Sequence, residues 1–467
     1  MTDVLGDLDA TGIAERIRAK DFTPQEAAEA AIARIQRLNP QLNFLVTEAF
    51  DYGRERTASA PASGPFAGVP TLIKDLLPLT GMPTKYGCRG LANFQLPDQS
   101  PYADALLASG LVPLGKSATP EFGLTATTEP LLGGPTRNPW DVNKSSGGSS
   151  GGAAVAVASG AVPIAHASDG GGSIRIPASC NGLVGLKVSR DRTVDARPLE
   201  VGVVLSVNGC VSRSVRDTAA WLAVSEQTGA GAQLAPVGMV GGASRQRLRI
   251  GVSIRDLRGR DPESDVREAT EDAATLCRDL GHSVREMKLP FDGDAVAGAF
   301  TMVWAAVAAE ATKGLRAAAG NTPLDALLEP MTIGLINVSE NAAPDALERA
   351  VAVLRGVESA YAALFDDIDI LLTPVLTSTP PALGEMGPAR GMDAFARAER
   401  YVGYTPLQNV AGAPAISLPL AQSPQSGMPI GSHFASAKGQ ERRLLELAYE
   451  LEQAKPWSSQ KPAVHAA

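Results

Sequence analysis

Residues Lys144 to Pro177 read KSSGGSSGGAAVAVASGAVPIAHASDGGGSIRIP, with two serine pairs near the start and glycine clusters near both ends. Between them, the run at 152–158 has a helical pattern and the run at 162–165 has strand character. A glycine cluster lets backbone N–H groups turn toward one point, because glycine adopts φ values that other residues resist. A serine at the end of the cluster can add a hydroxyl there. This combination predicts an oxyanion-binding turn beside a nucleophile.

Apolar runs with strand character and helical patterns alternate along the rest of the chain. The expected strands are 69–77, 111–114, 162–165, 183–188, 248–254, 368–372 and 415–420. The expected helices are 102–108, 152–158, 262–280 and 442–453. One more helix is expected to begin at the capping box Thr23-Pro24-Gln25-Glu26 and to end near Asn39 and Pro40. The alternation predicts an α/β fold around a largely buried mixed sheet.

Length alone does not show whether the chain forms one domain or several. A chain of 467 residues could hold about three domains by the usual length rule, although large α/β enzymes often exceed that rule within one domain. There is no internal repeat. The Gly- and Ala-rich segment 229–245 is expected to be a surface crossover, and the mostly helical region 292–365 could cap a site.

The composition of the chain disfavours some classes of binding partner. The net charge of −8 and the pI of about 5.3 disfavour broad electrostatic binding of nucleic acid or anionic membrane. The N-terminus lacks the apolar region of a secretory signal, and no apolar run of membrane-spanning length is apparent. The four cysteines lie far apart without metal-binding spacing. We therefore expect a soluble cytoplasmic protein with mostly buried thiols.

The run Gly110 to Ser117, GLVPLGKS, satisfies the phosphate-loop pattern G-x-x-x-x-G-K-S. A phosphate loop follows a strand and opens a helix. Here a helix-like segment precedes Gly110, the interior Leu-Val-Pro-Leu has strand character, and Pro113 removes one backbone donor. This order of elements disfavours nucleotide binding and makes Lys116 a lysine at a strand end.

The run Gly147 to Gly151, GGSSG, fits the G-x-S-x-G elbow of α/β-hydrolases. That elbow needs a hydrophobic strand directly before it, whereas residues 138–146 are polar and turn-forming. It also needs a late histidine base, for which His433 and His465 are the candidates. His433 lies on the alternating run 429–435, where a buried, hydrogen-bonded structural histidine is the simpler interpretation. A histidine-dependent hydrolase is therefore disfavoured.

Lys74 interrupts the apolar run 69–77, where one face of a strand is expected to be buried. A lysine that is held neutral can activate a serine, and a desolvated pocket favours the neutral amine. Burial of a lysine without such a role is unfavourable. The alternative is that Lys74 pairs with the neighbouring Asp75 at a strand end and reaches solvent. Position alone leaves both interpretations open.

Separated motifs along the chain resemble the amidase signature family in their order and spacing. They are GVP at 68–70 leading to KD at 74–75, GGSSGG at 147–152, DGGGSIRIP at 169–177 and GLVGLK at 182–187. The resemblance extends over nearly the whole chain. Within the family, the stretches 63–70 and 169–178 are similar to the branch with 6-aminohexanoate cyclic dimer hydrolases, aryl acylamidases and urethane-cleaving amidases.

The resemblance implies the α/β amidase signature fold, in which helices cover both faces of a large, twisted, mixed β-sheet. We expect a single domain over residues 1–467, with a signature core at about 60–220. A variable helical insert at about 292–365 would lie over the active site.

The resemblance also implies a catalytic triad. Ser173 would be the nucleophile, Ser149, which follows a cis peptide bond in this family, would relay the proton, and Lys74 would be the base. This chemistry is expected to need no metal and no cofactor. The expected oxyanion donors are the backbone N–H groups of Gly170, Gly171, Gly172 and Ser173.

Several residues near the triad are expected to support it. Asp169 and Arg175 flank Ser173, and an ion pair or hydrogen bonds to the glycine-rich turn would fix its shape, with direct substrate contact as the alternative. Ser150 could donate to Ser173 or cap the next helix. Family members often carry isoleucine or another bulky residue where this chain has Gly170, which predicts a more flexible oxyanion hole.

A substrate pocket is also implied by the resemblance. Gly123, Leu124 and Thr125 should line its acyl side. Met302 and Trp304, in the helical insert, are candidates for the leaving-group side, with an ordinary core role as the alternative.

The motifs predict an amidohydrolase that acts on a small molecule. Linear or aryl amides, cyclic or oligomeric amides (nylon oligomers among them) and carbamates (urethanes) all present a carbonyl with a nitrogen leaving group, and the same motifs serve each of them. Two alternatives share the motifs: the A subunit of a glutamine-dependent amidotransferase, and an esterase-leaning serine hydrolase. We expect a monomer or a homodimer with no nucleic-acid or membrane partner.

Overall fold

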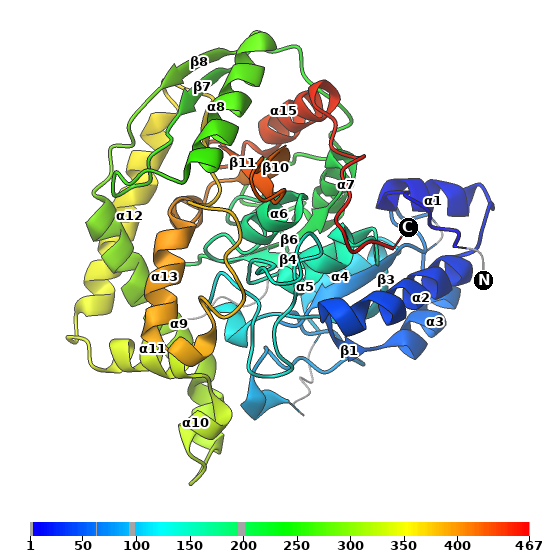
Figure 1. Ribbon diagram of the computed structural model, residues 1–467, viewed down its shortest axis with the longest axis horizontal. Helices are drawn as coiled ribbons and strands as arrows, with labels where there is room; N and C mark the ends of the chain where they lie inside the picture. The colour runs from blue at the N-terminus through cyan, green and yellow to red at the C-terminus, as the bar shows by residue number, and fades with distance from the viewer. Residues whose placement is uncertain (1–2, 62, 93–98, 195–200, 467) are drawn as a thin grey trace.

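The computed structural model describes residues 3–61, 63–92, 99–194 and 201–466, and within them one mixed sheet runs through the molecule (Figure 1). Its strands are β1 (Leu45–Glu48), β2 (Pro70–Lys74), β3 (Val112–Ser117), β4 (Ile164–Asp169), β5 (Val184–Lys187), β6 (Val207–Ser212), β7 (Arg249–Val252), β8 (Ser283–Glu286), β9 (Ile370–Pro374), β10 (Ala415–Gln422) and β11 (Pro429–Ala435). Their order in the sheet is β1-β3-β2-β4-β6-β5-β10-β11-β9-β7-β8.

Helices surround this sheet. They are α1 (Ala10–Arg18), α2 (Pro24–Leu42), α3 (Phe50–Ser59), α4 (Pro101–Ala108), α5 (Gly151–Ala158), α6 (Arg175–Asn181), α7 (Val215–Ser225), α8 (Ser264–Asp279), α9 (Gly293–Ala318), α10 (Leu324–Leu327), α11 (Pro330–Glu340), α12 (Ala346–Leu364), α13 (Met392–Val402), α14 (Pro406–Val410) and α15 (Glu441–Ala454). Three short 3₁₀ turns are also described, at Arg89–Leu91, Glu121–Gly123 and Pro388–Arg390.

The sheet is mixed, with parallel pairs at two places. Strand β2 pairs in parallel with β3 and β4, and β7 pairs in parallel with β8 and β9. The other neighbours are antiparallel: β1 with β3, and each pair in the series β4, β6, β5, β10, β11 and β9. Strands β2, β3, β5 and β9 are buried along their whole length, as expected for strands covered on both faces. The expected α/β fold with a large mixed sheet is confirmed.

Helices cover both faces of the sheet, and the side chains of β11, which point to the two faces in turn, show which helices lie on each face. His433 contacts Arg175 of α6 on one face. Its neighbour Phe434 belongs to the hydrophobic cluster that contains Leu444 of α15 and Ala273 of α8. Because successive side chains of a strand point to opposite faces, α6 lies on one face and α8 and α15 lie on the other. Helix α5 packs beside α6 and against β2 and β4.

The insert at 292–365 is helical, as expected, and comprises α9, α10, α11 and α12 on the side of the molecule away from α1, α2 and α3 (Figure 1). Helix α9 packs against α11 and α12. In the described part of the chain, α9 is the one helix long and apolar enough to cross a membrane by length and composition, which corrects the expectation of no such run. About 39% of its membrane-length window is buried, and its buried residues Val303 and Ala306 belong to a hydrophobic cluster with Leu354 of α12.

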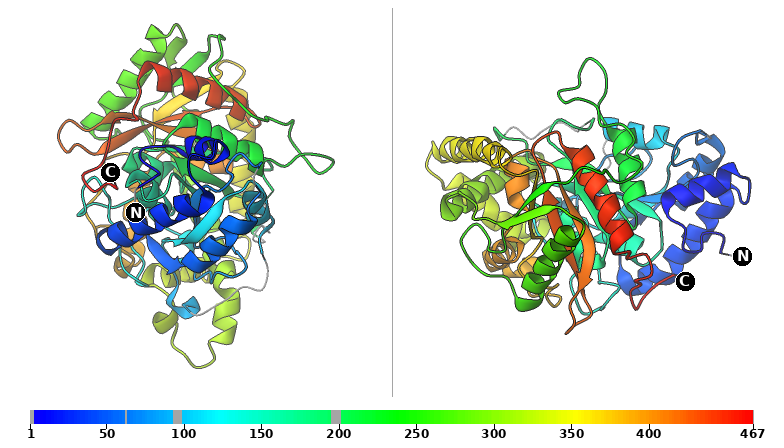
Figure 2. Two further views of the ribbon diagram at one scale, coloured as in Figure 1. Left: turned by 90° about the vertical axis from the view of Figure 1, so that its right-hand side faces the viewer. Right: turned by 90° about the horizontal axis from the view of Figure 1, so that it is seen from above.

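The structure also shows where the first long helix ends, what the segment 229–245 forms and where the cysteines lie. Helix α2 continues through Pro40 to Leu42, because Asn43 ends it in a left-handed conformation with its N–H donating to the Asn39 carbonyl at 2.8 Å. The expected crossover 229–245 contains neither helix nor strand and extends outward between α7 and β7 (Figure 2). The four cysteines are free and buried, as expected.

Candidate active site

Lys74 is the last residue of β2 and is completely buried. Strands β2 and β4 are parallel neighbours, with Leu72 opposite Ala165, so their carboxyl ends meet at the same edge of the sheet. Burial lowers the pKa of Lys74 to about 7, because desolvation disfavours the ammonium form; the nearby Asp169 carboxylate acts in the opposite direction. The structure therefore supports the buried-lysine interpretation over a solvent-exposed pair with Asp75.

Three oxygen atoms surround the Lys74 amine. Its Nζ lies 2.7 Å from Ser149 Oγ, 3.1 Å from Ser168 Oγ and 3.4 Å from the Ser168 carbonyl oxygen. A neutral amine has two N–H donors and one lone pair. The two oxygens of Ser168 can accept both N–H groups, which leaves the lone pair for the Ser149 hydroxyl. Ser168 was missed in the sequence, because it is an ordinary strand residue until β4 pairs beside β2.

His166 fixes the backbone of Lys74. The Lys74 N–H donates to His166 Nδ1 at 3.2 Å, so His166 Nε2 carries the ring proton toward Asn208 Oδ1, also 3.2 Å away. Burial lowers the pKa of His166 to about 3, which keeps the ring neutral. This histidine, within the quoted stretch of sequence, was not predicted to have a role.

The serine loop at 147–151 lies directly before α5. The Gly148–Ser149 peptide bond is cis, and Ser149 is buried. Both predicted roles of the Ser150 hydroxyl, capping the next helix and donating to Ser173, are wrong. The hydroxyl makes no capping bond, and it donates to the Ser168 carbonyl at 3.2 Å. The Ser150 N–H in turn donates to the Ser173 carbonyl at 3.3 Å. Ser150 therefore joins the serine loop to both β4 and the glycine-rich turn.

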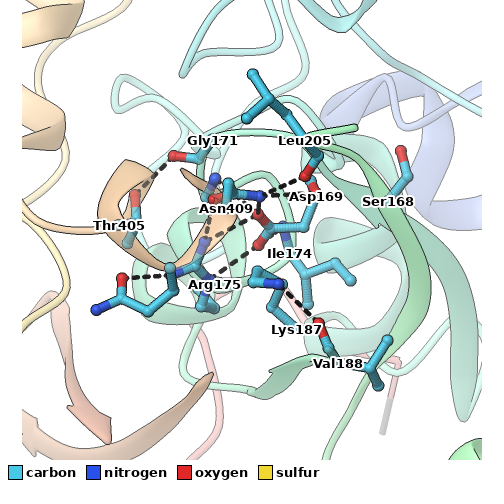
Figure 3. A network of polar contacts seen from close by, with 12 residues as sticks. Ser168, Asp169, Gly171, Ile174, Arg175, Lys187, Val188, Leu205, Thr405 and Asn409 are labelled. Atoms are coloured by element: carbon cyan, nitrogen blue, oxygen red, sulfur yellow. Dashed lines mark hydrogen bonds and ion pairs between the residues drawn. The ribbon is translucent and has the colours of Figure 1, made fainter. Parts of the chain in front are cut away.

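The glycine-rich turn is held by a buried ion pair (Figure 3). Arg175 Nη2 lies 2.9 Å from Asp169 Oδ1, and Arg175 Nε lies 3.0 Å from Oδ2. The same carboxylate accepts the N–H groups of Gly172 at 2.8 Å and Ile174 at 3.1 Å. The guanidinium holds the pKa of Asp169 well below its usual range despite burial. Asp169 and Arg175 thus support the turn, and the Gly172 amide is already used inside it.

Ser173 lies at a cavity of about 130 Å³. Gly123, Leu124 and Thr125 line this cavity, as the resemblance implied. Ser149 lies just behind them, because a Cβ built on Gly123 would be 3.2 Å from Ser149 Oγ. Of the three triad candidates, Lys74 contacts Ser149 directly, and the serine loop contacts Ser173 through the bond from the Ser150 N–H to the Ser173 carbonyl.

Helix α9 supplies another part of the cavity lining. Phe300 and Trp304 line the cavity with their rings stacked at 5.4 Å between centroids. A Cβ on Gly170 would meet Trp304 Cη2 at 3.1 Å, so the indole occupies space that a bulkier residue at 170 would need. Trp304 Nε1 also donates to the Leu124 carbonyl at 3.0 Å. Met302 does not line the cavity and packs in the core of the insert, because it lies on another face of the helix from its neighbours at 300 and 304.

The alternative motifs have structural roles. Lys116 is buried in β3, where its Nζ donates to the Leu77 carbonyl at 2.5 Å and to Thr84 Oγ1 at 2.9 Å. His433 is buried, bonded to Thr373 and Arg175, and has a pKa well below its usual value because of desolvation and the guanidinium. Across the ranges that the structure describes, there is no group of three or more His, Cys, Asp or Glu residues able to hold a metal ion.

A family model for Amidase matches residues 26–445. The chain belongs to the amidase family. A Mycobacterium leprae protein named "Putative amidase AmiC" is 44% identical over 98% of this chain and 97% of its own length. A 6-aminohexanoate-cyclic-dimer hydrolase from a Pseudomonas species is 35% identical over 97% of this chain and 96% of its own length. The expected family is therefore confirmed.

Solved structures agree with this assignment. A 6-aminohexanoate cyclic dimer hydrolase complexed with substrate superposes with a TM-score of 0.89 and 31% identity, covering 98% of this chain and 99% of that one. A bacterial aryl acylamidase of the amidase signature family superposes with a TM-score of 0.85 and 27% identity, covering 97% of both chains. The amidase-family chain is a hydrolase that acts on amide C–N bonds other than peptide bonds.

Proposed function

We propose that this amidase cleaves its substrate through an acyl-enzyme on Ser173, with Ser149 as the proton relay and Lys74 as the base. The observation that carries the proposal is the 2.7 Å separation of Lys74 Nζ and Ser149 Oγ in a fully buried setting. A buried lysine with a pKa of about 7 is largely neutral at slightly alkaline pH, and a neutral amine can accept a proton. The neighbouring cavity, which Ser173 lines, offers space for a substrate carbonyl.

Each step of the reaction has a group to perform it. Neutral Lys74 takes the Ser149 proton as Ser149 takes that of Ser173, and Ser173 Oγ forms a bond to the carbonyl carbon. When the C–N bond breaks, Ser149 gives a proton to the departing amine and regains one from the Lys74 ammonium. Water then attacks the acyl ester, with its proton passing to the same relay. The carboxylic acid leaves and Ser173 regains its proton.

Three of the four expected N–H donors remain available for an oxyanion. The Gly172 N–H donates to Asp169, so we assign the oxyanion to the N–H groups of Gly170, Gly171 and Ser173. One such donor contributes about 3–4 kcal/mol to transition-state stabilisation in hydrolases that have been measured. The Asp169 carboxylate fixes the turn by accepting the N–H groups of Gly172 and Ile174. This supports preorganised oxyanion donors rather than the more flexible oxyanion hole that Gly170 predicted.

The cavity favours an uncharged, apolar substrate with a flat group. Its lining contains the stacked rings of Phe300 and Trp304, and stacking on such rings stabilises an aromatic ligand. Charged residues also line the cavity but are already paired: Arg258 with Glu399 at 3.0 Å and Arg260 with Asp256 at 2.6 Å. We infer aryl amides as the favoured class, with aryl carbamates next. Two relatives carry the names aryl acylamidase and 6-aminohexanoate cyclic dimer hydrolase, so both chemistries belong in the test.

The test is a hydrolysis panel with the purified chain alone. It compares 4-nitroacetanilide, a 4-nitrophenyl carbamate, 6-aminohexanoate cyclic dimer and 4-nitrophenyl acetate, each with wild type and Ser173→Ala. We expect the anilide to be cleaved by wild type and not by Ser173→Ala. Cleavage by both proteins would contradict the role of Ser173. Activity that requires glutamine and a copurifying second chain would favour an amidotransferase subunit, and cleavage confined to the acetate would favour an esterase.

A further inference from the structure

We propose that Thr405 is a positioning residue for the reaction: it holds the Gly171–Gly172 peptide group of the glycine-rich turn, and so keeps the neighbouring N–H groups of Gly171 and Ser173 directed at the oxyanion. This inference rests on the proposed function of that turn. Thr405 is buried and comes from the segment directly before α14, far from the signature motifs in the sequence. It was not predicted from the sequence.

Both ends of the Gly171–Gly172 peptide group are held. Thr405 Oγ1 donates to the Gly171 carbonyl oxygen at 2.8 Å. The N–H of the same peptide group, on Gly172, donates to Asp169 Oδ1 at 2.8 Å. In a trans peptide the carbonyl and the N–H point in opposite directions, so these two bonds fix one orientation of the plane. Figure 3 shows Thr405 reaching Gly171 from one side of the turn and Asp169 lying on the other side.

The Thr405 hydroxyl does not make the capping hydrogen bond that is usual for a threonine at the start of a helix. Thr405 occupies the N-cap position of α14, where a threonine side chain ordinarily accepts a bond from a backbone N–H of the first turn. Here it makes no capping bond. Instead the hydroxyl proton goes to the Gly171 carbonyl. The contact is close, because a Cβ on Gly172 would lie 2.2 Å from Thr405 Oγ1.

Asn409, in the same short helix, holds Asp169, which accepts the N–H end of the Gly171–Gly172 peptide group. Its Nδ2 donates to the Asp169 carbonyl and to Asp169 Oδ1, each at 2.9 Å, and its Oδ1 accepts from Arg175 Nη2 at 2.7 Å. Positions 405 and 409 are four residues apart and therefore share one face of the helix. Pro406 and Leu407 line the cavity beside Gly171. The α14 segment thus contacts the turn directly through Thr405 and indirectly through Asp169.

A glycine-glycine peptide is the group most able to rotate in such a turn. Gly172 has φ of 129°, a conformation that other residues rarely adopt, and Gly171 has no side chain to restrain it. If the plane rotated, the Gly171 carbonyl oxygen would leave Thr405 and the Gly172 N–H would leave Asp169. Rotation of the plane changes the backbone torsions on either side of it, which set the directions of the neighbouring Gly171 and Ser173 N–H groups, and donors that are not held in place stabilise an oxyanion less well. The Thr405 bond opposes this rotation.

The experiment compares Thr405→Val, which removes the hydroxyl at nearly constant shape, with Thr405→Ser, which keeps it. Thr270→Val is the matched control, because Thr270 is also buried and its Oγ1 donates to the Val266 carbonyl at 2.9 Å, in α8. Ser173→Ala is the reference without a nucleophile. The readouts are kcat and KM for 4-nitroacetanilide, and the rate at which a fluorophosphonate labels the protein. The labelling rate does not depend on knowing the natural substrate.

We expect Thr405→Val to lower kcat and the labelling rate about tenfold or more, with KM little changed, because the loss falls on the transition state. Thr405→Ser should restore most of both rates, and Thr270→Val should match wild type. The melting temperature of Thr405→Val should fall no further than that of Thr270→Val.

Two results would overturn the inference: wild-type rates in Thr405→Val, or equally slow rates in Thr405→Ser and Thr405→Val. A loss of rate in Thr405→Val that only follows a loss of folded protein would also count against it. Continued labelling of Ser173→Ala would instead contradict the proposed function itself. The two failures are therefore distinguishable.

Discussion

Lys74 Nζ and Ser149 Oγ lie 2.7 Å apart at the carboxyl edge of β2, and neither residue has meaningful contact with solvent. Water would screen and protonate an exposed lysine, whereas this site disfavours the ammonium form by desolvation. Ser168 occupies the remaining hydrogen-bonding positions of the amine. The arrangement aims the lone pair of a neutral Lys74 at the Ser149 hydroxyl.

The pH dependence follows from this lysine. Its pKa is lowered to about 7 by burial, so the base is protonated and inactive below that pH and neutral above it. We expect kcat/KM to rise about tenfold per pH unit below the midpoint and to level off on the alkaline side. The midpoint is measured from a kcat/KM profile between pH 5 and pH 9 at constant ionic strength. A kcat/KM that still rises tenfold per pH unit at pH 9 would show that Lys74 is not held neutral.

The same lysine contributes to the pH dependence of folding. Its pKa is about 7 in the folded state and near its ordinary value, about 10.4, in the unfolded chain. Between these values the unfolded state binds more protons, so this group makes the free energy of unfolding rise with pH across that window. Urea unfolding of wild type and Lys74→Met at pH 7 and pH 9 measures the difference. An equal pH response in both proteins would contradict burial of a neutral amine.

Replacement of Lys74 tests the base directly. Lys74→Met keeps the length of the side chain and should lower kcat by about 10²–10⁴-fold, the usual contribution of a general base. Lys116→Met is the matched control, because Lys116 is a buried lysine whose pKa desolvation lowers to about 8 but which bonds to Leu77 and Thr84 instead of a serine. The control should keep the wild-type pH midpoint. If the two variants behave alike, the base is elsewhere.

Gly170 and Trp304 should be energetically coupled. A Cβ at 170 would lie 3.1 Å from the indole and 2.7 Å from Ser206 Oγ, so Gly170→Ala forces one of the neighbours to move. We expect Gly170→Ala to lower kcat/KM for 4-nitroacetanilide and Trp304→Leu to recover part of that loss in the double variant. The coupling should amount to about 0.5–3 kcal/mol, as for residues in direct contact. Additive effects would show that the indole does not restrain the oxyanion turn.

Nucleotide should not bind at the GLVPLGKS run. In the structure Val112–Ser117 is a buried strand, and the Lys116 amine is bonded inside the protein. ATP at about 1 mM should therefore leave the melting temperature unchanged, because a ligand raises it only by binding the folded state. A clear rise that depends on Lys116 would contradict this interpretation.

The sequence predicted local structure and the residues of the site better than their contacts. The helix candidates at 102–108, 152–158 and 262–280 correspond to α4, α5 and α8. Strands β1, β6 and β8 were missed, since each is short or carries polar residues and forms only by pairing with a neighbour. Periodicity records the burial of one element at a time and contains no information on pairing partners.

Contacts between distant segments explain what the sequence could not predict. The burial of Lys74 depends on the parallel pairing of β2 with β4, which brings Ser168 to its amine. The choice of Phe300 over Met302 as a cavity residue depends on how α9 is rotated about its axis. Thr405 reaches the glycine-rich turn only because α14 folds back over it. None of these relationships leaves a pattern in the local sequence.

The most direct test of the triad is to map the site of covalent modification. Wild-type protein is treated with a fluorophosphonate at pH 8, and the labelled peptide is identified by mass spectrometry, beside Ser173→Ala and Lys74→Met. We expect one adduct, on Ser173, which is absent in Ser173→Ala and forms far more slowly in Lys74→Met. An adduct on Ser149 or on any other residue, or undiminished labelling without Lys74, would contradict it.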